Sequence, residues 1–446
     1  MEHENKMGYE PVKQLILKMS LPPLCSMFLQ YSYNLVDSMF VAKINEQALT
    51  AVSLSFPITT LMLSLSIWVG VGINVLIAGY LGERKQKEAN TVTTLGLMIS
   101  ILLGACVNIL VMIFMKSYYA AFTTDHHIFD YGIIYMRVCA FMQVPNMVHI
   151  AIQKMLQATG NMITPMCFQI AGVVLNFILD PLLIFGIGPF PEMGIAGAAL
   201  ATVLGYTLSM GIALFILLFT KQKIRLDFKN YHFQLKMVRD IFGCGLPSFI
   251  MNALGAFMVT FVNAFLVFYS DTAVAFFGAY FKIQQLIVMT VNGLIQGCLP
   301  IMRFNYSANK KDRLKQTYLS GKRIAVCMMA FGTVLLLAFP DQILTLFSAS
   351  EEMKKIGIPA IRIMSVGFIF SGISIMTATY AQATNKLIKS VAIQLLRQAV
   401  LLLPVMGLLN AVLHISGIWI AFPVTEIAVC VLAVILIDGR AKKTNF

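Results

Sequence analysis

The sequence predicts an all-α integral membrane protein in which twelve transmembrane helices form two six-helix lobes related by a pseudo-twofold axis along the membrane normal. Composition is the first observation: 58% of the 446 residues are hydrophobic and only 12% are charged, against about one quarter charged in soluble domains. The second is the length of the apolar runs. Thr93–Met115 carries no charge over its whole length, which is enough to cross about 30 Å of hydrocarbon. The third is an internal repeat.

Apolar runs divide the chain into twelve spans, each bounded by polar or glycine- and proline-containing segments. The N-terminal stretch is polar and mixed in charge, without the pattern of a secretory signal peptide. The eight cysteines are scattered and form no CxxC motif, so neither a zinc site nor a disulfide framework is expected. In chain order the expected spans are 14–42, 48–80, 90–115, 128–157, 163–188, 194–220, 236–268, 273–300, 318–346, 356–382, 388–414 and 416–437.

Basic residues give the orientation of these spans. With the N-terminus placed in the cytosol, the inner segments hold 25 lysines and arginines and the outer segments hold 4. Cytosolic loops of membrane proteins carry this excess of positive charge, so both termini are expected to be cytosolic. Topology also accounts for the net charge of +13, and no nucleic-acid partner is expected.

The two halves of the chain resemble each other at a nearly constant separation in sequence. Gln157–Thr164 matches Gln382–Lys389, and Leu21-Pro22 matches Leu246-Pro247, both at one separation that we call the repeat offset. Six spans per half is an even number, so both halves share one topology, as in parallel-repeat transporters. We therefore expect an N-lobe at 1–220, a cytosolic linker at 221–236 and a C-lobe at 237–446.

Polar residues inside the first half point to one level of the bilayer. Counting along the expected helices places Asp37 about 9 Å, and Asp180 and Thr202 each about 12 Å, from the outer surface. Tyr135 lies at a comparable depth, and Asn176 lies one turn from Asp180 on the same helix face. Charged residues at membrane depth usually face an interior or a wet cavity. These five residues are the candidate cation-coupling site.

The chemistry of this cluster suits a hard cation. Asp37, Asn176 and Asp180 supply carboxylate and amide oxygens, and Pro181 leaves the carbonyl of Phe177 without its usual helix donor. Such oxygens can hold a proton shared between the two acids or a dehydrated Na⁺. The alternative is structural: Asp37 caps a helix end or meets outside water, and Asp180 is a hydrogen-bonded core acid.

The second half has no equivalent acidic pair. At the repeat offset Val262 and Val405 replace the two acids. Lys282, Arg397 and Glu426 lie within spans there and form a candidate second polar site. The alternative is a structural ion pair or side chains that reach the membrane surface.

Several motifs together resemble those of the multidrug and toxic compound extrusion (MATE) family, most closely the branch found in Gram-positive and gut bacteria. The resemblance covers nearly the whole chain and implies a two-lobed V of twelve helices. It also implies export of organic cations driven by inward H⁺ or Na⁺, and a bacterial cytoplasmic membrane location. The motifs are Asp37–Pro57, NFILDPLLIFG (Asn176–Gly186), GIAGAALATVLG (Gly194–Gly205), Asn292–Ala308 and Leu395–Pro404.

The resemblance also assigns residues. The family's N-lobe cation site maps onto Asp37, Asn176 and Asp180, with Thr202 and Tyr135 beside them. A family amide on the fourth helix has its nearest match in register at Gln153. The acidic residues that some members carry on the seventh and tenth helices are absent here.

The expected function is a cation-coupled (H⁺ or Na⁺) multidrug antiporter that exports amphipathic, mostly cationic organic compounds and acts as a monomer without a cofactor. The rival transporter is a lipid-linked saccharide flippase of the same superfamily, which would need several interior basic residues for pyrophosphate. An integral membrane enzyme such as a prenyl transferase would need an acidic metal-binding cluster in a cytosolic loop. The inner loops are basic, so no enzyme is expected.

Overall fold

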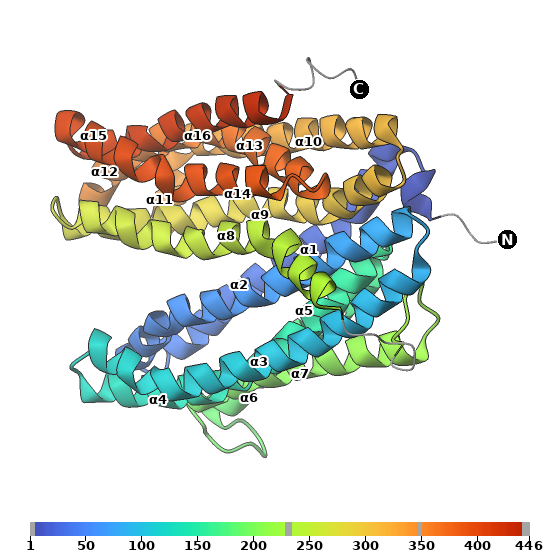
Figure 1. The fold of residues 1–446 in the computed structure, drawn as a ribbon. Coiled ribbons are helices and arrows are strands. Elements are labelled where there is room, and N and C mark those ends of the chain that lie inside the picture. The colour runs from blue at the N-terminus through green and yellow to red at the C-terminus, as the bar shows by residue number, and fades with distance from the viewer. Residues whose placement is uncertain (1–4, 228–233, 347–349, 439–446) are drawn as a thin grey trace. The chain divides into compact units, whose positions relative to one another are not determined.

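The computed structural model describes residues 5–227, 234–346 and 350–438, and these ranges fold into helices joined by short loops (Figure 1). Nine helices within those ranges are long and apolar enough to cross a membrane. The bent pair α12–α13 raises the number to ten. The C-terminal basic residues and positions 228–233 of the expected linker lie outside the described residues.

Each expected span of the first half corresponds to one helix, except the fourth, which is broken in two. Pro145 cannot donate a hydrogen bond to the carbonyl of Phe141, which accounts for the break between α4 and α5. Several helices also extend beyond their apolar runs into the polar flanks. The elements are η1 (Lys6–Gly8), α1 (Val12–Ala42), α2 (Glu46–Gly82), α3 (Gln86–Phe122), α4 (His126–Ala140), α5 (Gln143–Ala158), α6 (Ile163–Phe185) and α7 (Ile195–Phe219).

Three expected spans of the second half are interrupted. Pro340 separates α10 from α11, α12 and α13 meet at a bend of 42°, and a π-helical segment, η2, interrupts the eleventh span one turn before Pro404. The elements are α8 (Leu235–Leu266), α9 (Asp271–Ser307), α10 (Lys311–Ala338), α11 (Pro340–Leu346), α12 (Glu351–Ser365), α13 (Gly367–Ala383), α14 (Leu387–Leu395), η2 (Leu396–Val400), α15 (Leu402–Leu413) and α16 (Ile415–Asp438).

The chain divides into two compact units, and the division differs from the expected boundary in the linker. Unit 1 contains Cys25–Phe249, and unit 2 contains Met7–Leu24 together with Ile250–Phe446. The first part of α1 therefore packs in unit 2, and the first part of α8 packs in unit 1. The two crossing points are separated by the repeat offset and closely follow the Pro22–Pro23 pair and Pro247.

Close helix packing accounts for the position of the first part of α8 in unit 1 and of the first part of α1 in unit 2. In unit 1 the indole of Trp68 on α2 donates to the carbonyl of Phe242 at 2.7 Å and stacks on Phe249 with ring centroids 4.5 Å apart. In unit 2 the equivalent of Trp68 is Gly293, which lies against Leu24, the equivalent of Phe249. The contact between Trp68 and Phe249 in unit 1 therefore has its counterpart between Gly293 and Leu24 in unit 2.

Turns repeat at the same offset. Arg84 and Asn309 adopt positive φ angles of 60° and 56°, and Gly160 and Asn385 adopt 90° and 59°. A non-glycine residue at positive φ is uncommon, so its recurrence at equivalent turns reflects a shared backbone path. Structure and sequence therefore support the same internal repeat.

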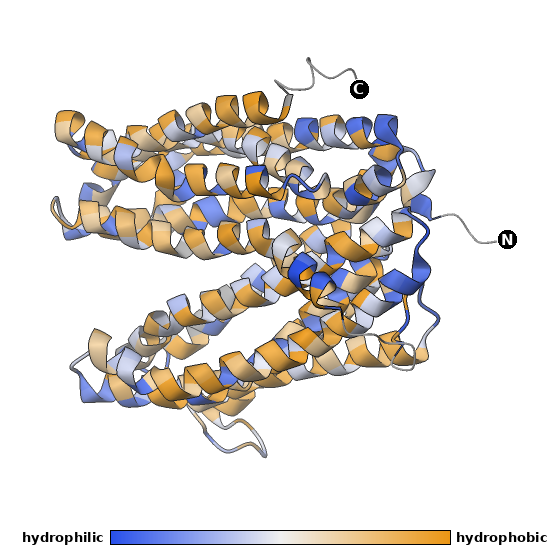
Figure 2. Cartoon of the chain, in the orientation of Figure 1, coloured by the Kyte–Doolittle hydropathy of each residue, from blue (hydrophilic) through white to orange (hydrophobic). Residues whose placement is uncertain are grey.

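The surface polarity suits a membrane protein. Figure 2 shows hydrophobic residues along the whole of α7 and hydrophilic residues at the first turns of α10. On α7, Phe215 and Phe219 are 59% and 75% exposed. Large apolar side chains exposed on a helix surface are expected where lipid is the solvent.

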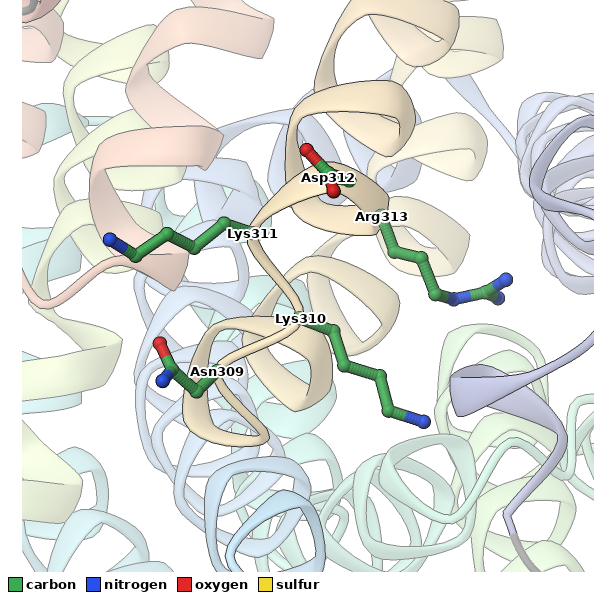
Figure 3. A pocket seen from close by; sticks show the side chains of 5 residues that line it. All are labelled: Asn309, Lys310, Lys311, Asp312 and Arg313. Carbon is green, nitrogen blue, oxygen red and sulfur yellow. The ribbon is translucent and has the colours of Figure 1, made fainter. Parts of the chain in front are cut away.

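The start of α1 is held to the loop between α9 and α10, within unit 2. Arg313 donates to the carbonyls of Met7 at 3.2 Å and Glu10 at 2.7 Å, and Lys310 donates to that of Gly8 at 3.0 Å. Lys310 and Arg313 also line a pocket of about 410 Å³. Figure 3 shows these two side chains extending to one side of the loop and Lys311 to the other.

Candidate functional site

The first component of the candidate site is α6, which carries Asn176 and Asp180 on one buried face. Asp180 is fully buried and Asn176 is 3% exposed. The helix continues through Pro181 and ends at Gly186, whose φ of 66° forms a left-handed cap. The apolar residues of α6 thus bury a carboxyl and an amide one turn apart.

The second component is α7, which approaches α6 closely because glycines face each other. A methyl group added at Gly205 would lie 2.8 Å from the carbonyl oxygen of Gly172 and 3.0 Å from Cβ of Asn176. This approach lets the Asn176 amide donate to the Thr202 hydroxyl at 3.3 Å. Thr202 in turn donates to the carbonyl of Ala198 at 3.1 Å.

The third component is α1, which brings Asp37 to Asp180. The two carboxyl groups lie within hydrogen-bonding range of each other. One turn further along both helices, the rings of Phe40 and Phe185 meet edge to face at 6.3 Å. Two ionised carboxylates can only accept, so the pair is hydrogen-bonded only when one carboxyl holds a proton.

Four acceptor oxygens of this site are buried and have no hydrogen-bond donor among the described residues. They are Oδ1 of Asp37, both carboxyl oxygens of Asp180 and Oδ1 of Asn176. Buried polar atoms are nearly always paired in folded proteins. Four unpaired acceptors around two acids fit a cation, because a proton or a hard metal ion takes oxygen ligands.

Tyr135 lies at the outer edge of the site. It belongs to one buried cluster with Val41, Ile184 and Ala198, each about one turn from a site residue. Its side chain is within hydrogen-bonding range of the Cys139 thiol. The structure therefore brings Asp37, Asp180, Asn176 and Thr202 together, and Tyr135 lies in the same buried cluster as residues that flank them.

A polar layer lies beside the acidic pair, and of its members only Gln153 was singled out from the sequence, as the nearest match to the family amide. Gln153 on α5 donates to Gln169 on α6 at 3.0 Å, and Gln169 donates to Gln30 on α1 at 3.3 Å. Beside them, the ring of His149 lies 5.4 Å from that of Tyr206. The sequence spacing could have indicated that two members of the layer lie on the same helix faces as the site residues. Gln30 precedes Asp37, and Gln169 precedes Asn176, by about two helical turns.

In unit 2 the three residues of the candidate second polar site do not all meet. Nε of Arg397 in η2 donates to Oε1 of Glu426 on α16 at 2.7 Å. Lys282 on α9 is exposed. The valines that replace the acids, Val262 and Val405, are buried and partly buried.

A family model and two relatives match most of the chain. The family model described as MatE matches residues 22–182 and 247–432, two segments whose starts are separated by the repeat offset. The chain is 26% identical over 425 residues to the FAD transporter of Shewanella oneidensis, covering 94% of this chain and 92% of that protein. It is 25% identical over 436 residues to the multidrug export protein MepA of Staphylococcus aureus, covering 96% and 93%.

Solved structures have the same fold. An outward-facing multidrug resistance MATE transporter of the MOP superfamily superposes with a TM-score of 0.92 at 23% identity. A MOP superfamily transporter from Pyrococcus furiosus, described as having a binding pocket of reversed polarity, gives 0.93 at 22%. Each comparison covers 100% of both chains. The twelve-helix, two-lobe fold expected from the sequence is the fold of these structures.

Proposed function

The chain belongs to the MATE family of membrane transporters, and on that premise we propose that it is a cation-coupled antiporter that exports amphipathic, mostly cationic organic compounds. The coupling ion is H⁺ or Na⁺, held by Asp37, Asn176 and Asp180 with Thr202 and Tyr135 at the edge. A transporter of this family is not an enzyme, so the site binds and releases ions and substrate without covalent chemistry.

The observation that carries this proposal is the buried pair of Asp37 and Asp180 with its unpaired acceptor oxygens. Two like charges in a low-dielectric interior repel each other and lose their hydration. A bound cation relieves both costs. An inward-moving ion and an outward-moving organic cation can each supply that positive charge, so competition for the same acids would make their movements mutually exclusive.

Prolines lie in both helices that carry the acids, about four turns before Asp37 on α1 and directly after Asp180 on α6. Pro22 and Pro23 interrupt the hydrogen bonding of α1, the helix that carries Asp37, and Pro181 follows Asp180 directly. A change in charge at the acids can therefore alter the position of α1 at modest cost. We propose this movement as the link between ion binding and substrate release.

A second candidate substrate comes from the relative named an FAD transporter. A dinucleotide carries negative phosphates, which would require available cationic groups in the interior. The Arg397–Glu426 pair is neutral and so does not offset the charge of several phosphates, and a cationic substrate fits the acids of unit 1 better. The same reasoning places the lipid-linked saccharide flippase second. We further propose that the protein acts as a monomer in the bacterial cytoplasmic membrane with both termini in the cytosol.

The test is dye export by purified protein in liposomes, with a H⁺ gradient, a Na⁺ gradient or neither. Rhodamine B ethyl ester serves as the cationic dye, and FAD as the anionic competitor. We expect one ion gradient to drive export of the dye, and Asp180→Asn to abolish it. Asp271→Asn, the same change at an exposed site on α9, is the matched control. Export of FAD but not of the dye would overturn the proposal.

A further inference from the structure

A second site of unusual chemistry lies in unit 2, at the ion pair between Arg397 and Glu426. A fully formed pair uses two guanidinium N–H groups and both carboxylate oxygens. Here only one bond is made, from Nε to Oε1 at 2.7 Å. The terminal nitrogens of Arg397 make no hydrogen bond with any described residue, and Oε2 of Glu426 is buried without a donor. Each partner therefore has an unused half.

The surroundings of the pair contain further unused polar atoms. The hydroxyl of Tyr280 on α9 is fully buried, has no hydrogen-bond partner among the described residues, and lies close enough to Glu426 to interact electrostatically. Oε1 of Gln394, one turn before Arg397, is likewise unpaired, and its residue is 4% exposed. Gly367, where α13 begins, packs against Glu426 without a side chain of its own.

The backbone at Arg397 is also irregular. It lies in the π-helical segment η2 between α14 and α15. Such segments inside α-helices are rare and are frequently found at functional sites. The side chains of Arg397 and Glu426 retain 9% and 16% of their surface. Oε2 of Glu426 is buried, whereas the terminal nitrogens of Arg397 are not among the buried unpaired atoms, so the arginine side of the pair is the accessible one.

The charges define what can bind here. The pair is neutral, so a ligand of net charge leaves an uncompensated charge in a buried place. A ligand with a negative and a positive group leaves none. Its carboxylate can accept hydrogen bonds from the terminal nitrogens of Arg397, and its positive group can lie near the negative charge of Glu426.

We propose that the Arg397–Glu426 pair recognises the carboxylate of zwitterionic substrates. The pair sets specificity among exported compounds, an inference that rests on the proposed export function. A purely cationic compound gains nothing at the pair, because attraction to Glu426 is offset by repulsion from Arg397. The pair therefore separates zwitterions from cations that share the same aromatic framework.

The experiment compares the binding of rhodamine B with that of rhodamine B ethyl ester to purified protein, by fluorescence anisotropy. The dyes share one cationic ring system and differ in a free carboxylate. Replacing both partners, Arg397→Gln with Glu426→Gln, avoids leaving one buried charge unpaired. We expect the Kd of rhodamine B to rise about tenfold, the loss expected for a charge-assisted hydrogen bond, and that of the ester to change less than about twofold.

Tyr280→Phe is the second variant, because it keeps the ring and removes only the hydroxyl. It should weaken rhodamine B binding by a smaller factor and leave the ester unaffected. An equal change for both dyes in either variant would indicate a purely structural pair and overturn the proposal, as would no change for either. Dye export tests the antiport proposal separately, because binding is measured without any gradient.

Discussion

The carboxyl groups of Asp37 on α1 and Asp180 on α6 lie within hydrogen-bonding range of each other inside unit 1. Their helices are also joined one turn away by the contact between Phe40 and Phe185. An interior placement of two acids costs free energy unless a positive charge is shared between them. Function is the simplest reason for a membrane protein to retain that cost.

The first prediction is that the two acids act as one unit. Asp37→Asn and Asp180→Asn should each lower gradient-driven dye export at least about tenfold, because one remaining acid can hold a proton but cannot share it. The double variant should be no worse than the more damaging single one. Initial export rates in liposomes containing equal amounts of protein check this. A double variant in which the two losses multiply would show that the acids act independently.

The second prediction concerns the close approach of α6 and α7. Gly205→Ala places a methyl group 2.8 Å from the carbonyl oxygen of Gly172 and 3.0 Å from Asn176. We expect a loss of about 1–3 kcal/mol in stability from this overpacking, and weaker export because Thr202 moves away from Asn176. Melting temperature and export rate are the measurements.

Gly211→Ala is the matched control for that variant. It lies on the same helix, and a methyl group there meets nothing within 4 Å. Alanine is a better helix former than glycine by about 1 kcal/mol, so this variant should be neutral or slightly stabilised. Equal losses in the two variants would mean that helix flexibility matters here, rather than the α6–α7 distance.

The main features of the fold were predictable because a lipid bilayer requires long apolar helices, which are visible in the sequence as apolar runs. Twelve apolar runs gave twelve spans, and each matches a helix or a run of consecutive helices. The depth of Asp37 and Asp180 followed from the rise per residue alone, and their meeting in the structure agrees with it. The local sequence pattern does not show which helices pack against each other in the folded protein. Nothing in residues 12–24 indicates that they pack with unit 2.

Interruptions of helices were also missed, and the reason is local. Apolar residues continue on both sides of the breaks near Pro145, Pro340 and Pro404, so each pair of helices was expected as one span. The missing proline donor was visible in the sequence, but many prolines sit inside continuous helices here, including Pro57 and Pro300. Whether a proline breaks a helix depends on neighbours that satisfy the freed carbonyl.

The third prediction concerns the polar layer beside the acids. Gln169 bridges Gln153 and Gln30, so Gln169→Leu leaves an amide donor of Gln153 and an amide acceptor of Gln30 without this partner in a partly buried layer. Each costs about 1–3 kcal/mol. Melting temperature should fall, and exchange of backbone amides in α1 near Gln30 should quicken. Gln169→Met, similar in length but equally unable to bridge, should behave like Gln169→Leu if the hydrogen bonds are responsible. A Met variant as stable as the wild type would assign the effect to shape instead.

The final prediction is that Arg313 holds the start of α1 in unit 2. Its guanidinium bonds the carbonyls of Met7 and Glu10, and hydrogen bonds to a charged donor are worth about 1.5–3 kcal/mol. Arg313→Ala should therefore increase hydrogen exchange in residues 12–24 while leaving exchange in α6 and α7 unchanged. Lys311→Ala is the control, because that side chain is exposed and extends to the opposite side of the loop (Figure 3). Faster exchange in both variants would point to a general effect of charge in the loop. Unchanged exchange in Arg313→Ala would mean that the packing of Gly293 and Gly297 against Leu24 and Ser20 is sufficient to hold the half-helix.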